Sequence, residues 1–193
     1  DGLLGINNSD ANYYYQESLN ASREIIRSDI FSLYRKDPDP VKNFGDLFID
    51  ESNNSEVIFA EKYDYDEGKS HQWDALAQPS GFGFNWSSNY TVYLETLEQF
   101  DFTDGSSGML DRSIYDDATE IDPNWFFEMR DPRMRASIFY PGSSFKGGTV
   151  HFHRSSSGTL AGWPKTGPSK HIGSMATGLL IRKRTNPETP DAT

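Results

Sequence analysis

Cysteine is absent from this 193-residue chain, and both long apolar runs and positive charge are in short supply. Without cysteine the chain can form no disulfide and has no thiolate to act as a nucleophile or metal ligand. The longest apolar runs fall far short of the roughly 20 residues that cross a bilayer as a helix. Lysine and arginine number 18 against 29 aspartate and glutamate, which gives a formal net charge of -11. Nucleic acid is therefore a poor partner, because phosphate binding needs a basic surface.

Aliphatic side chains are also few, whereas aromatic side chains are plentiful. Hydrophobic residues make up 35% of the chain and aromatic residues 14%. Burial of apolar surface must then depend on Phe, Tyr and Trp, which each bring a large contact area. We expect long irregular loops that aromatic side chains anchor.

Hydrophobic periodicity predicts helices joined by loops and short strands. Apolar side chains recur at helical spacing over residues 10–27 and again over residues 89–100. Residues 62–88 show little periodicity and are expected to be a long loop. Shorter helices are expected over 44–49 and from residue 122 onward, and strands over 56–61, 137–140, 149–154 and 177–183. The fold class is therefore α+β, mainly helical and loop-rich, with short β-strands and hairpins.

The ends of the chain have a distinct composition. It begins at Asp1 with no methionine, so we expect that residues upstream have been removed. A single domain is expected over residues 1–185. Residues 186–193, with the sequence NPETPDAT, are expected to be a disordered tail because they lack apolar side chains to bury.

The sequence RDPR at residues 130–133 concentrates charge directly before a strand-like segment. In a catalytic interpretation Asp131 would be a base and Arg133 an oxyanion clamp, but no partner group is close in sequence. In a structural interpretation Arg133 forms a buried, bidentate pair with a carboxylate or binds backbone carbonyls. Pro132 would fix the chain so that the next strand starts in register. We favour the structural interpretation for Asp131 and Arg133 and predict no catalytic residue.

Three other polar clusters resemble metal sites only in part. His151 and His153 share one face of a predicted strand, a spacing compatible with two metal ligands, but no third ligand is apparent. Strand alternation alone explains that pattern. The acidic turns at 64–68 and 101–105 lack EF-hand spacing, so solvated turns are favoured over a surface calcium. We predict no metal site and no cofactor.

The aromatic residues in the predicted loops are candidates for ligand binding. Trp73, Phe82, Phe84, Trp86 and Trp163 lie where burial is hard to arrange, and Asn85 supplies an amide between Phe84 and Trp86. Sugar rings stack their C–H faces on flat aromatic faces while polar side chains bind the hydroxyls. The alternative is that these aromatic side chains anchor the loops on the core.

The order of several motifs resembles that of the SusD/RagB family. The motifs are REIIRSDIFSLY, NNSEVIFAEKYD, FDFTDGS, RDPRMRASIFYPG and TGLLIRKR. The most specific match is Asp131-Pro132-Arg133, whereas Asp29 stands where the family usually has glycine, which tolerates a left-handed backbone better. The resemblance covers nearly all of this chain but only the middle of the family's pattern. We therefore expect a fragment that lacks the lipidated N-terminus and several helices.

The resemblance implies part of a tetratricopeptide-like scaffold and a non-catalytic, glycan-binding function. Family members capture oligosaccharides or polysaccharides at the surface of the outer membrane and deliver them to a SusC-type TonB-dependent transporter. Attachment to the membrane would be through a lipid anchor that is absent from this chain. Two alternatives stay open: a glycoside hydrolase, which needs two carboxylates across a cleft, and a module that contacts only the transporter.

Overall fold

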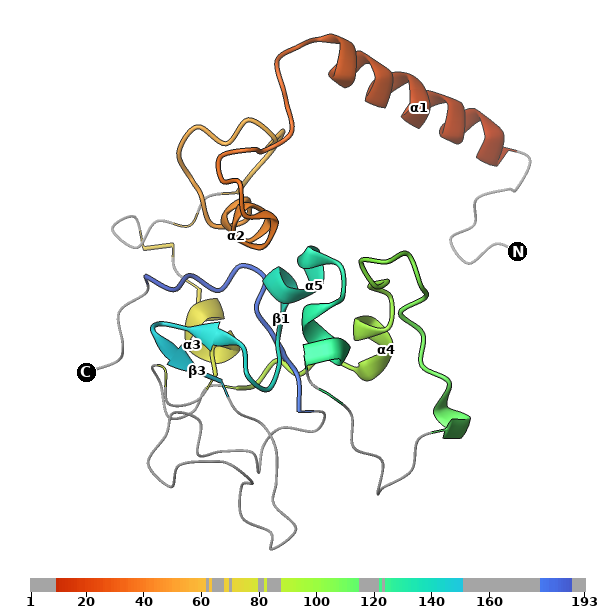
Figure 1. Ribbon diagram of the computed structural model, residues 1–193. Helices are drawn as coiled ribbons and strands as arrows, with labels where there is room; N and C mark the ends of the chain where they lie inside the picture. The colour runs from red at the N-terminus through yellow and green to blue at the C-terminus, as the bar shows by residue number, and fades with distance from the viewer. Residues whose placement is uncertain are drawn as a thin grey trace, which may run out of the picture. The chain divides into compact units, whose positions relative to one another are not determined.

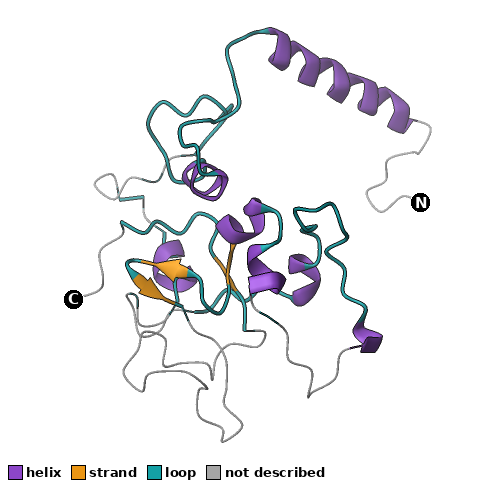
Figure 2. Cartoon of the chain, in the orientation of Figure 1, coloured by secondary structure: helices purple, strands orange, loops and turns teal. Residues whose placement is uncertain are grey.

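A computed structural model describes residues 10–61, 63, 68–69, 71–79, 82, 88–114, 122, 124–150 and 178–188. These residues form short helices and loops with a few short strands (Figures 1 and 2), which confirms the predicted fold class. The chain divides into two compact units. Unit 1 comprises Asp1–Arg35 with Asp50–Lys62, and unit 2 comprises Lys36–Ile49 with Tyr63–Thr193. Among the described helices, none has the length and apolar character needed to cross a membrane.

Unit 1 contains the longest helix, α1 (Ala11–Arg27), which confirms the helix predicted over 10–27. None of its residues is buried, although its sequence is amphipathic. After the helix, Asp29 adopts φ 54°, the left-handed conformation that explains why glycine suits this position. An aspartate there is tolerated because its short polar side chain can bond locally.

The remainder of unit 1 is held together around Tyr34, which is 6% exposed. Its backbone N–H donates to the Glu56 carboxylate at 2.7 Å and its hydroxyl donates to Asp50 at 2.8 Å. The strand predicted over 56–61 is wrong, since none of these residues is in a strand. Phe59 is 90% exposed and Ile58 59% exposed. An apolar run becomes a strand only when a neighbouring strand pairs with it, and no described residue does so here.

Unit 2 begins with α2 (Pro40–Asp46), four residues earlier than the helix predicted over 44–49. The Asp39 carboxylate accepts the backbone N–H of Val41 at 2.9 Å, and Pro40 occupies the first helical position. Aspartate followed by proline is a helix-start signal as much as a chain breaker, which accounts for the shift. Unit 2 also contains α3 (Trp73–Ala77), α4 (Leu94–Leu97), the 3₁₀ turn η2 (Arg112–Ile114), the π-helical turn η3 (Asn124–Glu128) and α5 (Pro132–Ser137).

The helix predicted over 89–100 is wrong over its first half. Only α4 is helical, because Thr91 forms a bridge with Leu180 and the Val92 N–H donates to the Leu179 carbonyl at 3.0 Å. This segment is thereby committed to an extended conformation beside the end of the chain. The short helix predicted from residue 122 corresponds to η3, and α5 follows it separately.

Two small antiparallel sheets complete unit 2. Strand β1 (Ile138–Phe139) pairs with β4 (Leu180–Ile181), which places Ile138 opposite Ile181 and confirms the strands predicted in both regions in shorter form. Strand β2 (Ser144–Phe145) pairs with β3 (Gly148–Thr149) through a two-residue turn. Both turn residues, Lys146 and Gly147, have positive φ, as the favoured hairpin turns require. Of the strand predicted over 149–154, the structure describes only Thr149 and Val150.

The core of unit 2 is rich in aromatic side chains, as its composition predicts. Phe127 stacks on Tyr140 with ring centroids 4.7 Å apart, and Phe139 meets Phe145 edge-on at 4.9 Å. These rings belong to two hydrophobic clusters that β1 connects, since Ile138 lies in one and Phe139 in the other. At the start of the predicted tail, the backbone N–H of Asn186 donates to the Asp74 carboxylate at 2.7 Å. The single domain over 1–185 and the tail over 186–193 stay predictions.

Candidate functional site

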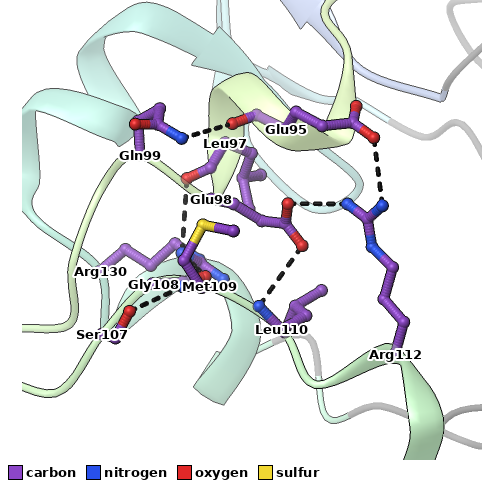
Figure 3. Close-up of polar contacts among 10 residues, drawn as sticks. All are labelled: Glu95, Leu97, Glu98, Gln99, Ser107, Gly108, Met109, Leu110, Arg112 and Arg130. Carbon is purple, nitrogen blue, oxygen red and sulfur yellow. Dashed lines mark hydrogen bonds and ion pairs between the residues drawn. The ribbon is translucent and has the colours of Figure 1, made fainter.

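Arg130 is the buried charge of the arginine cluster, with 0% of its surface exposed. Its Nε–H donates to the Phe126 carbonyl at 2.8 Å. Its Nη1 donates to the carbonyls of Phe100 at 2.8 Å and Gly108 at 3.0 Å, and to that of Leu97 at 3.4 Å. Figure 3 shows this guanidinium reaching both the α4 segment and the chain near Gly108. One side chain therefore fastens three separate backbone segments.

Aromatic faces complete the site around Arg130. Its guanidinium carbon lies 4.5 Å from the Phe102 ring centroid and 5.0 Å from that of Phe126. Burial lowers the pKa of Arg130 below its ordinary value, and the nearby Glu98 and Asp101 carboxylates act in the opposite direction. Ring faces and carbonyl oxygens thus replace water around a buried cation.

Gly108 is required by this close packing. A Cβ atom at this position would lie 2.2 Å from the Phe100 carbonyl oxygen and 2.7 Å from Nη1 of Arg130. The backbone N–H of Gly108 also donates to the Asp101 carboxylate at 3.0 Å. Only glycine allows the chain to approach the guanidinium this closely.

A second buried charge, Glu98, lies beside this site with 1% exposure. Its carboxylate accepts a hydrogen bond from Nη2 of Arg112 at 2.7 Å and another from the Leu110 N–H at 3.4 Å (Figure 3). The hydrogen bond to Glu98 raises the pKa of Arg112, to which Glu95 also contributes. The segment from Leu110 to Arg112 is therefore attached to Glu98, the C-cap residue of α4, by an ion pair and by a hydrogen bond from a backbone N–H.

Asp131 and Arg133 lie at the start of α5. The Asp131 carboxylate caps the helix by accepting the Arg133 backbone N–H at 2.8 Å, and Nη2 of Arg133 lies 2.6 Å from the same carboxylate. This contact lowers the pKa of Asp131. The Arg133 side chain is 62% exposed, so the expectation of a buried pair there is wrong. Pro132 begins a helix of six residues, and the strand follows only at Ile138.

The sequence alone does not show that Arg130 is buried and Arg133 exposed. Apart from Phe126, the groups that enclose Arg130 come from residues 97–108, which show no spacing relation to the motif. The structural roles assigned to Asp131 and Arg133 stay predictions, although both side chains take part in capping α5.

Of the predicted loop aromatics, the structure describes two: Phe82, which is 6% exposed and anchors its loop on the core, and Trp73. Trp73 is half-buried at the first position of α3, and its ring stacks on Tyr90 with centroids 5.0 Å apart and an interplanar angle of 23°. His71 accepts the Trp73 backbone N–H at 3.2 Å. The His71 ring meets the Tyr63 ring edge-on, with centroids 5.0 Å apart. We call these four residues the aromatic array. Tyr63, His71 and Tyr90 were not predicted as site residues. His71 lies two residues before Trp73, whereas the contacts of Tyr63 with His71 and of Tyr90 with Trp73 depend on the fold.

Helix α3 and its C-cap residue carry buried polar side-chain groups that have no hydrogen-bond partner. Gln78, at the end of α3, is 1% exposed, and neither atom of its side-chain amide has a hydrogen-bond partner. The indole N–H of Trp73 is also buried and unpaired. A buried polar group without a partner costs about 1–3 kcal/mol, so such groups usually bind water or a ligand.

The other predicted site residues lie outside the described residues, so the structure does not test whether they meet. These residues are Phe84, Asn85, Trp86, Trp163, His151 and His153. Within the described ranges, no group of three or more His, Asp and Glu side chains could hold a metal ion. In the turn at 101–105, one carboxylate oxygen of Asp104 accepts both the backbone N–H and the hydroxyl of Ser106.

Comparisons with known proteins identify one family and one fold. The sequence model of the SusD family matches residues 55–193. A crystal structure of a SusD-like protein from Bacteroides fragilis superposes with a TM-score of 0.59 at 16% sequence identity. The match covers 84% of this chain and 31% of that protein, so the chain spans less than a third of its length. No curated protein matches this sequence.

Proposed function

This chain belongs to the SusD family, and from that premise we propose that it is a non-catalytic, glycan-binding protein serving nutrient uptake. The observation that carries the proposal is the family match over residues 55–193. The ligand would be an oligosaccharide or polysaccharide, and the partner a SusC-type TonB-dependent transporter. The protein would act at the surface of the outer membrane, held by a lipid anchor outside these 193 residues.

The aromatic array supports this proposal physically. The half-buried Trp73 is held by its stack on Tyr90, so a sugar ring could bind without first ordering the indole. We propose Trp73, Phe84, Asn85, Trp86 and Trp163 as ligand-binding residues, with the array as the part that the structure describes.

Glycoside hydrolysis is the alternative to binding. Hydrolysis of a glycosidic bond needs two carboxylates free to act on one substrate. Among the described residues, Glu98 is engaged by Arg112, Asp131 by Arg133 and Glu128 by Arg135. A reducing-sugar assay with each polysaccharide that binds separates these two functions, because a hydrolase would release new reducing ends.

The test is calorimetric titration of the chain and its Trp86→Ala variant with a panel of oligosaccharides. We expect Trp86→Ala to weaken binding by about ten-fold or more, since loss of an aromatic anchor commonly costs more than about 1–2 kcal/mol. Tyr93→Ala is a matched control, because Tyr93 is 70% exposed and lies outside the array. Thermal melts should be nearly unchanged for both variants. If the parent chain binds a SusC-type transporter but no glycan, the chain is an interaction module instead.

A further inference from the structure

A second stacked aromatic pair lies in unit 2, with no residue in common with the aromatic array. Trp125, in η3, stacks on Phe102 with ring centroids 5.0 Å apart and an interplanar angle of 20°. The two rings differ in exposure: Phe102 is 9% exposed and Trp125 is 42% exposed. The pair therefore has a buried inner ring and an outer ring that is open to solvent.

The inner ring is held firmly. The backbone of Phe102 forms an antiparallel bridge with Arg130, and its N–H donates to the Ser106 carbonyl at 3.0 Å. The Arg130 guanidinium also lies 4.5 Å from the Phe102 ring centroid. Because the support is fixed, the Trp125 indole loses little conformational freedom when a ligand binds to it.

The residues around Trp125 expose little apolar surface and several hydrogen-bonding groups. Met129, four residues further on, is 47% exposed. Asn124, the residue before Trp125, is exposed, and Thr103 is joined to this turn by hydrogen bonds from its N–H and hydroxyl to the Met129 carbonyl. Asp122, also exposed, accepts the Asn124 N–H at 3.0 Å.

These features discriminate between kinds of ligand. The open part of one indole offers on the order of 100 Å², whereas a stable protein interface needs about 800 Å² on each partner. A sugar ring matches the smaller area, and its hydroxyls match the neighbouring amide and carboxylate groups. The acidic side chain of Asp122 and the formal net charge of -11 disfavour polysaccharides that carry uronic acids.

From these observations we infer that Trp125 is a second stacking platform, which binds one neutral pyranose residue of a polysaccharide. This inference rests on the proposed function and adds a site that the aromatic array does not include. A glycan long enough to reach both platforms would bind more tightly than a short one, because its second binding event is intramolecular.

The test uses the 193-residue chain with three neutral polysaccharides, soluble starch, arabinoxylan and mixed-linkage β-glucan, and with polygalacturonate as the anionic probe. Affinity electrophoresis measures binding, and nuclear magnetic resonance follows the four indole N–H signals, assigned by single substitutions. We expect a neutral polysaccharide to shift the Trp125 signal, and Trp125→Ala to weaken binding by about three- to ten-fold. Trp125→Phe, which keeps a ring on Phe102, should retain most of the affinity.

Each other outcome has a distinct meaning. If the parent chain binds a glycan while the Trp125 signal and the affinity of Trp125→Ala are unchanged, the second platform is overturned and the proposed function stands. If Trp125 responds only to polygalacturonate, the assignment to neutral sugars is overturned. If none of the four polysaccharides binds the chain, the proposed function and the second platform are both overturned. Thermal melts of Trp125→Phe control for loss of structure.

Discussion

Arg130 and Arg133 are three residues apart and have opposite environments. Removing the Arg130 side chain in Arg130→Ala would leave the carbonyls of Phe126, Phe100 and Gly108 without their donor and open a cavity. A buried polar group left without a partner costs about 1–3 kcal/mol, and the cavity adds to this, so we expect a loss of about 3–5 kcal/mol in the free energy of unfolding. Urea denaturation measures it.

The matched control is Arg133→Ala. Its side chain is 62% exposed, and surface ion pairs are worth only about 0–1 kcal/mol. Arg130→Lys adds a second comparison, because an ammonium group cannot reproduce the fork of the guanidinium and should restore only part of the stability. Equal losses for Arg130→Ala and Arg133→Ala would contradict the assignment of Arg130 as the buried lock.

At the scale of the element, α5 depends on its N-terminal cap. Hydrogen bonding from Arg133 lowers the pKa of Asp131 in the folded chain below its ordinary value, which is near 3.8. A carboxylate with a lowered pKa stabilises the fold at pH values above its unfolded pKa, and this contribution is lost as pH falls through the folded value. We expect Asp131→Ala to cost about 0.5–2 kcal/mol at pH 7 and progressively less below about pH 4.

Asp131→Asn separates the cap from the charge. Asparagine caps helices about as well as aspartate, so this variant should keep most of the stability at pH 7 and lose the acid dependence at this site. Unfolding by urea at several pH values between about 2 and 7 gives both quantities. A cost of Asp131→Ala that stays constant over that range would show that protonation of this carboxylate does not contribute.

The elements predicted from sequence are those that local signals determine. Helix α1 follows from apolar spacing, and β1 and β4 from runs of β-branched and aliphatic residues between turns. The strand predicted over 56–61 and the first half of the helix over 89–100 are wrong because distant partners decide them. Thr91 is extended because Leu180 pairs with it, and that pairing has no signature near residue 91.

The candidate site shows the same division. The sequence RDPR indicates a structural role, yet which arginine is buried depends on carbonyls supplied by residues 97–108 and by Phe126. Trp73 could be singled out as a loop aromatic, but its partner Tyr90 could not, since the predicted helix placed Tyr90 on a different element. Sequence identifies the residue types of the site, and tertiary contacts determine their neighbours.

For the whole molecule, the distribution of buried apolar surface between the two units is uneven. Both hydrophobic clusters belong to unit 2. In unit 1, Tyr34 is the buried hydrophobic side chain among the described residues. The large apolar side chains that unit 1 exposes are Tyr13, Tyr14, Tyr15, Leu19, Ile26, Ile30, Leu33, Val57, Ile58 and Phe59. Most helices in proteins are stabilised by the packing of their apolar face, and α1 has little such packing.

This imbalance predicts two levels of protection in native-state hydrogen exchange. Amides of α1 should exchange by local fraying, whereas those of Val92, Ile181 and Arg182, which bond across unit 2, should exchange only by larger openings. We expect the amides of the second group to exchange at least about 100-fold more slowly than those of α1, because global unfolding of a domain costs about 5–15 kcal/mol. If α1 is protected as strongly as β1 and β4, its apolar face is covered in solution. Repeating the exchange at ten-fold dilution then tests self-association, since a cover supplied by a second copy is lost on dilution and one supplied by the same chain is not.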